Sequence, residues 1–113
     1  MSKFSRDKGK RGEREWAKFL RDHGIEARRG VQHKGGPGSP DVESSLPFHF
    51  EVKRTERFSV YDALEQARID LSEMIPLQGS RVLCAPPVAV AHKRNGKPWV
   101  VCMYADEWLS MTE

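Results

Sequence analysis

Two short stretches of the sequence contain the residue types that hold a divalent metal ion. Asp41 stands ten residues before Glu51, and Val52 and Lys53 follow directly. Ser-Leu-Pro at 45–47 predicts a turn between the two stretches, so they can form neighbouring strands. Because side chains repeat every second residue along a strand, Glu51 and Lys53 share a face, which Asp41 can approach. The two carboxylates suit Mg²⁺ or Mn²⁺, and the backbone carbonyl of Val52 could supply a further ligand.

This combination fits the hydrolysis of a phosphodiester. A metal ion held by Asp41 and Glu51 would lower the pKa of a water molecule and neutralise phosphate oxygens. Lys53 could orient or deprotonate that water, or stabilise charge in the transition state. Glu13 lies on a predicted helix and could reach the same site, where it would hold metal water or a second ion. The structural alternative is that Asp41 caps a turn while Glu51 and Lys53 form a surface ion pair.

The charge distribution points to a polyanionic partner. The chain has 113 residues and a net charge of +3, yet residues 1–34 hold 11 Lys or Arg against 5 Asp or Glu. A basic third of this kind favours nucleic acid as a partner, although a solvated helix face would look the same. The candidate DNA-binding residues are Lys8, Lys10, Arg11, Arg14, Arg28, Arg29 and Lys34.

Composition excludes several other classes of protein. No apolar run approaches the roughly 20 residues of a membrane span, and the first residues lack the apolar core of a signal peptide. The two cysteines form no CxxC pair, which argues against a disulfide scaffold or a zinc ribbon and favours a reducing compartment. We therefore expect one cytoplasmic domain over residues 1–113, with no membrane partner and no small-molecule cofactor.

Periodicity predicts an α/β domain with a mixed sheet flanked by helices, in the order α-β-β-β-α-β-β-α. Residues 1–7 are expected to form a flexible basic arm, and the Gly- and Pro-rich residues 30–40 a flexible loop. Asn95-Gly96 predicts a hairpin. The predicted helices are 8–23, 60–74 with a capping residue at Ser59, and 105–111 capped near Asp106; the predicted strands are 25–31, 40–44, 48–53, 87–93 and 97–104, with a further short strand or extended loop at 81–85.

The sequence resembles the PD-(D/E)xK nucleases, and within them the archaeal-type Holliday junction resolvases, including versions encoded by phages. The resemblance runs from about Lys8 to Trp108. It is carried by Lys8-Gly9, Glu13-Arg14, Phe19-Leu20-Arg21 and Gly24 in the opening helix, Arg28-Arg29 before the glycine loop, Pro40-Asp41-Val42, Phe50-Glu51-Val52-Lys53, and Gln66 on the next helix.

The resemblance implies a restriction-endonuclease-like fold and a homodimer that cuts four-way DNA junctions with Mg²⁺, for which Mn²⁺ would substitute. It makes Glu13, Asp41 and Glu51 the acidic site residues and Lys53 the catalytic lysine. Gln66 and His49 are candidates for contacts just behind the metal ligands, His49 because it shares the strand face of Glu51. The expected setting is a prokaryotic or phage-infected cell.

One feature departs from the family pattern. Many relatives carry a serine before a glycine in the loop that precedes the metal-site aspartate, whereas this chain reads His33-Lys34-Gly35-Gly36. Ser39 adjoins Pro40, so the role of that serine is not transferred to it. Two alternatives stay open: a nuclease of the same core that acts on forks, flaps or linear duplex, and a DNA-binding module without catalysis.

Overall fold

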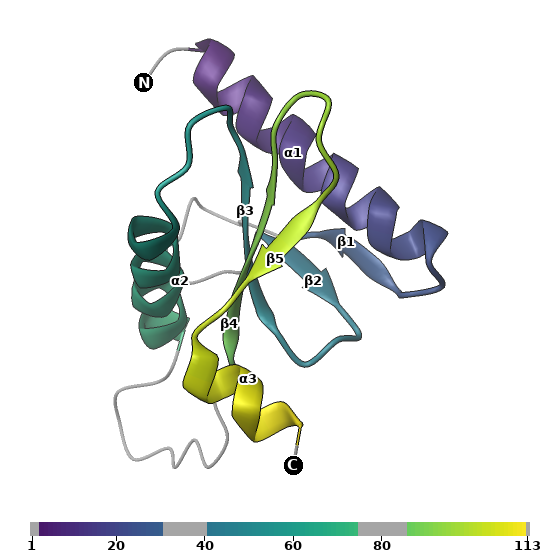
Figure 1. Cartoon of the computed structure of the whole chain (residues 1–113). Helices are drawn as coiled ribbons and strands as arrows, with labels where there is room; N and C mark the ends of the chain where they lie inside the picture. The colour runs from purple at the N-terminus through teal and green to yellow at the C-terminus, as the bar shows by residue number, and fades with distance from the viewer. Residues whose placement is uncertain (1–2, 31–40, 75–85, 113) are drawn as a thin grey trace.

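A five-stranded mixed sheet forms the centre of the molecule (Figure 1). The computed structural model describes residues 3–30, 41–74 and 86–112. The strands are β1 (Ala27–Arg29), β2 (Val42–Ser44), β3 (His49–Arg54), β4 (Val88–Lys93) and β5 (Val100–Cys102), and they lie in this order across the sheet. Only the central pair, β3 and β4, is parallel; the other neighbours are antiparallel.

In the described residues three helices accompany the sheet: α1 (Lys3–Asp22), α2 (Val60–Met74) and α3 (Ala105–Met111). The α-β-β-β-α-β-β-α order and the restriction-endonuclease-like α/β class predicted from the sequence are confirmed. The short strand or extended loop predicted at 81–85 lies outside the described residues, as does all of the predicted loop 30–40 except residue 30. Within the described ranges, no helix combines the length and apolar character needed to cross a bilayer.

Helix α1 packs on one face of the sheet. Trp16, Ala17 and Leu20 are buried there against Phe50 and Val52 of β3. The helix ends as predicted, because Gly24 adopts a left-handed conformation (φ +82°) and its N–H donates to the Arg21 carbonyl. It begins at Lys3, five residues earlier than predicted, so residues 3–7 are helical rather than part of an arm. No proline interrupts this stretch, and helical backbone bonds continue through it.

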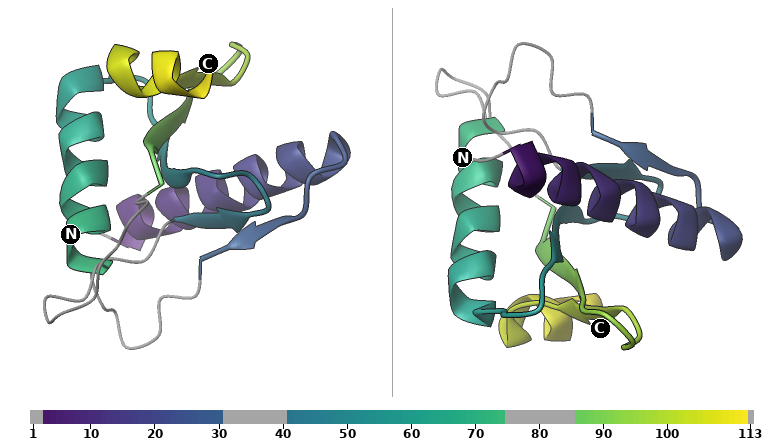
Figure 2. Two further views of the ribbon diagram at one scale, coloured as in Figure 1. Left: turned by 90° about the horizontal axis from the view of Figure 1, so that it is seen from below. Right: turned by 90° about the horizontal axis from the view of Figure 1, so that it is seen from above.

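Helix α2 packs on the other face. Its small and apolar residues Ala63, Leu64 and Ala67 are buried against Val88 and Val90 of β4. This is the apolar stripe that the sequence predicts for residues 60–74. The views in Figure 2 show α1 and α2 lying against different sides of the sheet. Strand β3 touches both helices, so its alternate residues face two separate environments.

The last two strands form the predicted hairpin. Gly96 has φ +74°, which the tight turn requires, and the N–H of Lys97 donates to the Arg94 carbonyl. The closing helix differs from prediction at its start. Tyr104, with an extended backbone, occupies the N-cap position and makes no side-chain cap; the Asp106 carboxylate instead accepts from the neighbouring Glu107 N–H.

Candidate active site

Asp41 and Glu51 face each other across the β2–β3 pair. The register places Val42 opposite Phe50, and the N–H of Asp41 donates to the Phe50 carbonyl at 3.0 Å. The Asp41 carboxylate also accepts a hydrogen bond from the N–H of Val52 through Oδ2, at 2.8 Å. Antiparallel pairing therefore brings the two carboxylates together, while a backbone donor fixes the orientation of one of them.

Glu51 is almost completely buried, at 7% exposure. Its Oε1 lies 3.8 Å from the Lys53 ammonium, while no donor in the described part of the chain hydrogen-bonds its buried Oε2. Burial, followed by repulsion from Asp41, raises the pKa of Glu51 to about 9. A buried carboxylate oxygen with no donor is costly, and a cation would offset that cost.

Asp41 is also shifted toward the protonated form. Burial raises its pKa to about 6, against the opposing effect of the hydrogen bond from Val52, and repulsion from Glu13 adds to the rise. Because Asp41 and Glu51 repel each other and are shielded from water, they do not readily both ionise. The pair would ionise together more readily beside a divalent cation, which attracts both negative charges.

Glu13 reaches the site from α1. Its Oε1 accepts a hydrogen bond from Nε of Arg29 on β1 at 3.0 Å, and its side chain is 14% exposed. The close approach of α1 depends on Gly12, because a Cβ there would lie 2.5 Å from the Cβ of Arg54 on β3. A glycine at this position lets the helix carry Glu13 toward the sheet.

The residues present fit a magnesium ion. Mg²⁺ is commonly held by one or two carboxylates, with waters and substrate phosphates completing its shell. Asp41 and Glu51 supply that number of carboxylates, and Glu51 Oε2 is an unsatisfied oxygen. In the described ranges, no group of three or more His, Cys, Asp or Glu residues is placed to bind a metal. The donor set thus matches a cation that shares its coordination with water and substrate rather than one in an all-protein cage.

Comparison with family models decides the relationship of the chain. Residues 4–107 match the model of the archaeal Holliday junction resolvase family. The chain belongs to this family. The resemblance to the PD-(D/E)xK nuclease superfamily is thereby confirmed. No significant match was found among curated proteins or among solved structures. Family membership makes the protein a nuclease of the junction-resolvase type, from a family that binds branched DNA and generally depends on a divalent metal.

Sequence reasoning missed one acidic residue of this candidate site. After burial and Asp41, contact with Asp70 of α2 is the next influence that raises the pKa of Glu51. Nε2 of Gln66 donates to Asp70 Oδ1 at 3.1 Å, so Gln66 holds the carboxylate that contacts Glu51. The signal was available in α2: Asp70 stands seven residues after Ala63, where the sheet-facing stripe continues.

His49 shares the face of Glu51, as the strand alternation predicts. It is 2% exposed, and its Nε2 has no hydrogen-bond partner in the described part of the chain. Burial lowers its pKa, while Asp70 acts in the opposite direction. Burial therefore favours the neutral form of the imidazole, which lies two residues before Glu51 on the same face of β3.

The candidate DNA-binding residues occupy different settings. Arg29 is paired with Glu13, and Nε of Arg28 lies 3.4 Å from Glu43 Oε2. The structure does not describe the Lys8 side chain. It also does not describe Lys34 or the rest of loop 31–40, which includes His33–Gly36 and Ser39. The exposed members on α1 are Lys10, Arg11 and Arg14.

Proposed function

We propose that this protein is a Mg²⁺-dependent endodeoxyribonuclease that resolves four-way DNA junctions by paired phosphodiester hydrolysis. The observation that carries the proposal is the pair formed by half-buried Asp41 and buried Glu51, beside Lys53, in a chain of the resolvase family. Asp41, Glu51 and the Val52 carbonyl would hold the metal, with Glu13 acting directly or through water. The metal would supply Lewis acidity that lowers the pKa of a water and offsets charge on the phosphate.

Lys53 has the position of a group that acts on substrate. Its ammonium lies 3.8 Å from Glu51 and its side chain is 37% exposed, so the contact leaves donors free for DNA. It can orient a water or donate to a phosphate oxygen as charge builds in the transition state. Arg28, Lys10, Arg11 and Arg14 would contribute backbone contacts that weaken steeply with salt.

A homodimer suits the proposed reaction. Resolving a junction requires two cuts in opposed strands, and one small domain carries one such site, so a two-fold dimer would supply both. An exposed apolar surface at the open edge of the sheet supports this proposal, since α3 buries none of its residues and β5 is an edge strand. Its exposed residues are Val100, Val101, Trp108, Leu109 and Met111.

A cleavage assay on DNA of several shapes tests the proposal. End-labelled mobile four-way junction, fork, flap and linear duplex are incubated in Mg²⁺ with wild type, Glu51→Ala and the matched control Glu65→Ala, whose glutamate is exposed on α2. We expect paired symmetric cuts near the crossover from wild type and the control, and none from Glu51→Ala, which should still bind the junction. Cutting of forks, flaps or duplex alone would move the function to those substrates. Tight junction binding with no cutting by any variant would make the protein a binding module.

A further inference from the structure

A cleft of about 330 Å³ opens beside Lys53, between the end of β3 and the first turns of α2. Neither Asp41 nor Glu51 lines it, so it adjoins the candidate active site and shares Lys53 with it. Its size lies at the lower end of the range for small-molecule sites, which run from roughly 300 to 1,000 Å³. The lining residues that matter here are Lys53, Thr55, Arg57, Phe58, Asp62 and Gln66.

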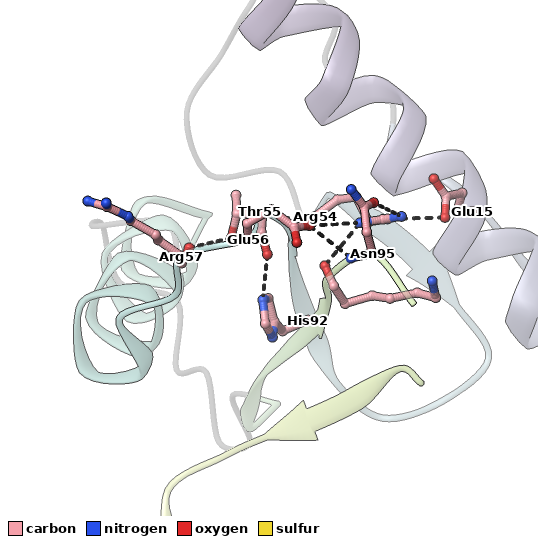
Figure 3. Close-up of polar contacts among 8 residues, drawn as sticks. Glu15, Arg54, Thr55, Glu56, Arg57, His92 and Asn95 are labelled. Carbon is pink, nitrogen blue, oxygen red and sulfur yellow. Dashed lines mark hydrogen bonds and ion pairs between the residues drawn. The ribbon is translucent and has the colours of Figure 1, made fainter. Parts of the chain in front are cut away.

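Residues 55–58 form one wall of this cleft and are held in place by His92 of β4. His92 of β4 stacks on Phe58, with ring centroids 4.0 Å apart and planes 7° apart. Nε2 of His92 donates to the Thr55 carbonyl at 2.9 Å, and Thr55 Oγ1 donates to the Arg57 carbonyl at 2.7 Å (Figure 3). Side chains on a neighbouring strand therefore fix a surface connection that has no secondary structure of its own.

The same segment is also tied to the hairpin turn. Arg54 donates to Asn95 Oδ1 at 3.0 Å, and the N–H of Asn95 donates to Glu56 Oε2 at 2.8 Å. Glu15 of α1 lies 3.3 Å from Nε of Arg54. The residues before and after Thr55 are thus anchored to the hairpin turn and to α1, and Thr55 itself to β4, so this cleft wall is preorganised. Preorganised contacts lower the entropy that a ligand loses on binding.

Arg57 differs from the neighbouring arginines. In Figure 3 its side chain extends away from the Arg54–Asn95 network. The Arg57 side chain is exposed, and its guanidinium makes no hydrogen bond or ion pair within the part of the chain that the structure describes. Arg29 and Arg54, by contrast, are paired with glutamates. A guanidinium whose backbone is fixed and whose donors are free is suited to binding a phosphate.

We propose that this cleft binds one unpaired nucleotide of the DNA strand, next to the phosphate on which Lys53 acts. This inference rests on the proposed function and names the feature of branched DNA that the site would recognise. Arg57 would bind the backbone phosphate, Phe58 would provide an apolar wall for the base, and Asp62 and Gln66 would accept and donate hydrogen bonds to base edges. At about 330 Å³ the cleft is of a size for one nucleotide rather than a base pair, so it would favour a nucleotide that has left its pair at the branch point.

Substitution of Arg57 tests the inference against a matched arginine. Arg57→Ala is compared with Arg94→Ala, an exposed arginine of the hairpin turn that changes net charge equally. For junction binding by wild type and both variants, we expect Arg57→Ala to weaken affinity about tenfold and to reduce the slope of log affinity against log salt by about one. Arg94→Ala should remain within about twofold of wild type, and Arg57→Lys should recover most of the loss. Equal effects of the two alanine variants would overturn the inference.

A second measurement does not depend on cleavage. A 5′-phosphorylated thymidine dinucleotide is titrated into wild type without divalent metal while backbone amide signals are followed by NMR. Shifts at residues 55–66 in wild type, absent in Arg57→Ala, are expected. If wild type cuts no DNA but these amides shift, the proposed function fails and the cleft inference stands. If wild type resolves junctions while the dinucleotide leaves these amides unchanged and Arg57→Ala binds junctions like Arg94→Ala, the cleft inference fails and the proposed function stands.

Discussion

The two faces of the six-residue strand β3 differ: one packs in the apolar core and the other carries the proposed active-site residues. On the α1 side, Phe50 and Val52 pack against Trp16 in a closed apolar cluster. On the α2 side, buried Glu51 and His49 each carry a side-chain atom with no hydrogen-bond partner in the described part of the chain. Burial of the apolar face stabilises the fold. Burial of polar groups without hydrogen-bond partners on the other face destabilises it.

Adjacent cations at the end of β3 repeat this contrast. Arg54 points to the α1 side, where its guanidinium donates hydrogen bonds to Glu15, Asn95 and the Lys93 carbonyl. Lys53 points to the other side and meets Glu51 only at 3.8 Å. A fully engaged cation stabilises the fold, while a cation with free donors is available to a substrate. Alternation along the strand therefore separates a cation that stabilises the fold from the cation proposed to act on substrate.

Paired methionine substitutions should separate these two cations most clearly. Lys53→Met is expected to slow single-turnover junction cleavage by roughly 10²–10⁴-fold, because a transition-state contact is removed, with the free energy of unfolding changed by about 0.5 kcal/mol or less. Arg54→Met should instead lower the free energy of unfolding by about 1–3 kcal/mol through lost hydrogen bonds. Cleavage kinetics and urea denaturation measure the two effects. Similar profiles for both variants would abolish the distinction.

The apolar face is tested by Phe50→Ala. Phe50 is 2% exposed and meets the ring of Trp16 edge-on at 5.4 Å. Removal of the ring should cost about 3–5 kcal/mol of unfolding free energy, as for other buried aromatic residues. Chemical denaturation measures this change. A decrease in unfolding free energy below about 1 kcal/mol would show that the apolar cluster does not stabilise the sheet.

The sequence predicted the fold closely because each element carries a local signal. The apolar stripe of α2, the alternation of residues 48–53 and the Asn95-Gly96 turn all depend on neighbours within a few positions. Contacts between distant segments could not be predicted in this way. Arg54 meets Asn95 across 41 positions, and Asp70 reaches Glu51 only because α2 crosses the strand at that point. The early helix start at Lys3 was also missed, since basic residues are compatible with both a helix and an arm.

The fold should become more stable at alkaline pH when Glu51 is replaced by a side chain that cannot ionise. Burial and repulsion from Asp41 raise the pKa of Glu51 to about 9, from an ordinary value of 4.5. Between these values the folded state keeps a proton that the unfolded state releases, so the free energy of unfolding falls as pH rises. Without divalent metal, Glu51→Gln should flatten this dependence and stabilise the fold by on the order of 2–4 kcal/mol near about pH 8. Denaturation curves at acidic and alkaline pH report it; a variant less stable than wild type at both would refute the cost assigned to this carboxylate.

Thermal denaturation with and without Mg²⁺, at equal ionic strength and about pH 8, tests most directly whether the Asp41–Glu51 pair holds a divalent cation. A ligand that binds only the folded state raises the melting temperature. We predict that Mg²⁺ raises the Tm of wild type and of the control Glu65→Gln, and that Asp41→Asn and Glu51→Gln each abolish the rise. No rise in wild type, or an equal rise in the two site variants, would contradict the assignment of this pair as the metal site.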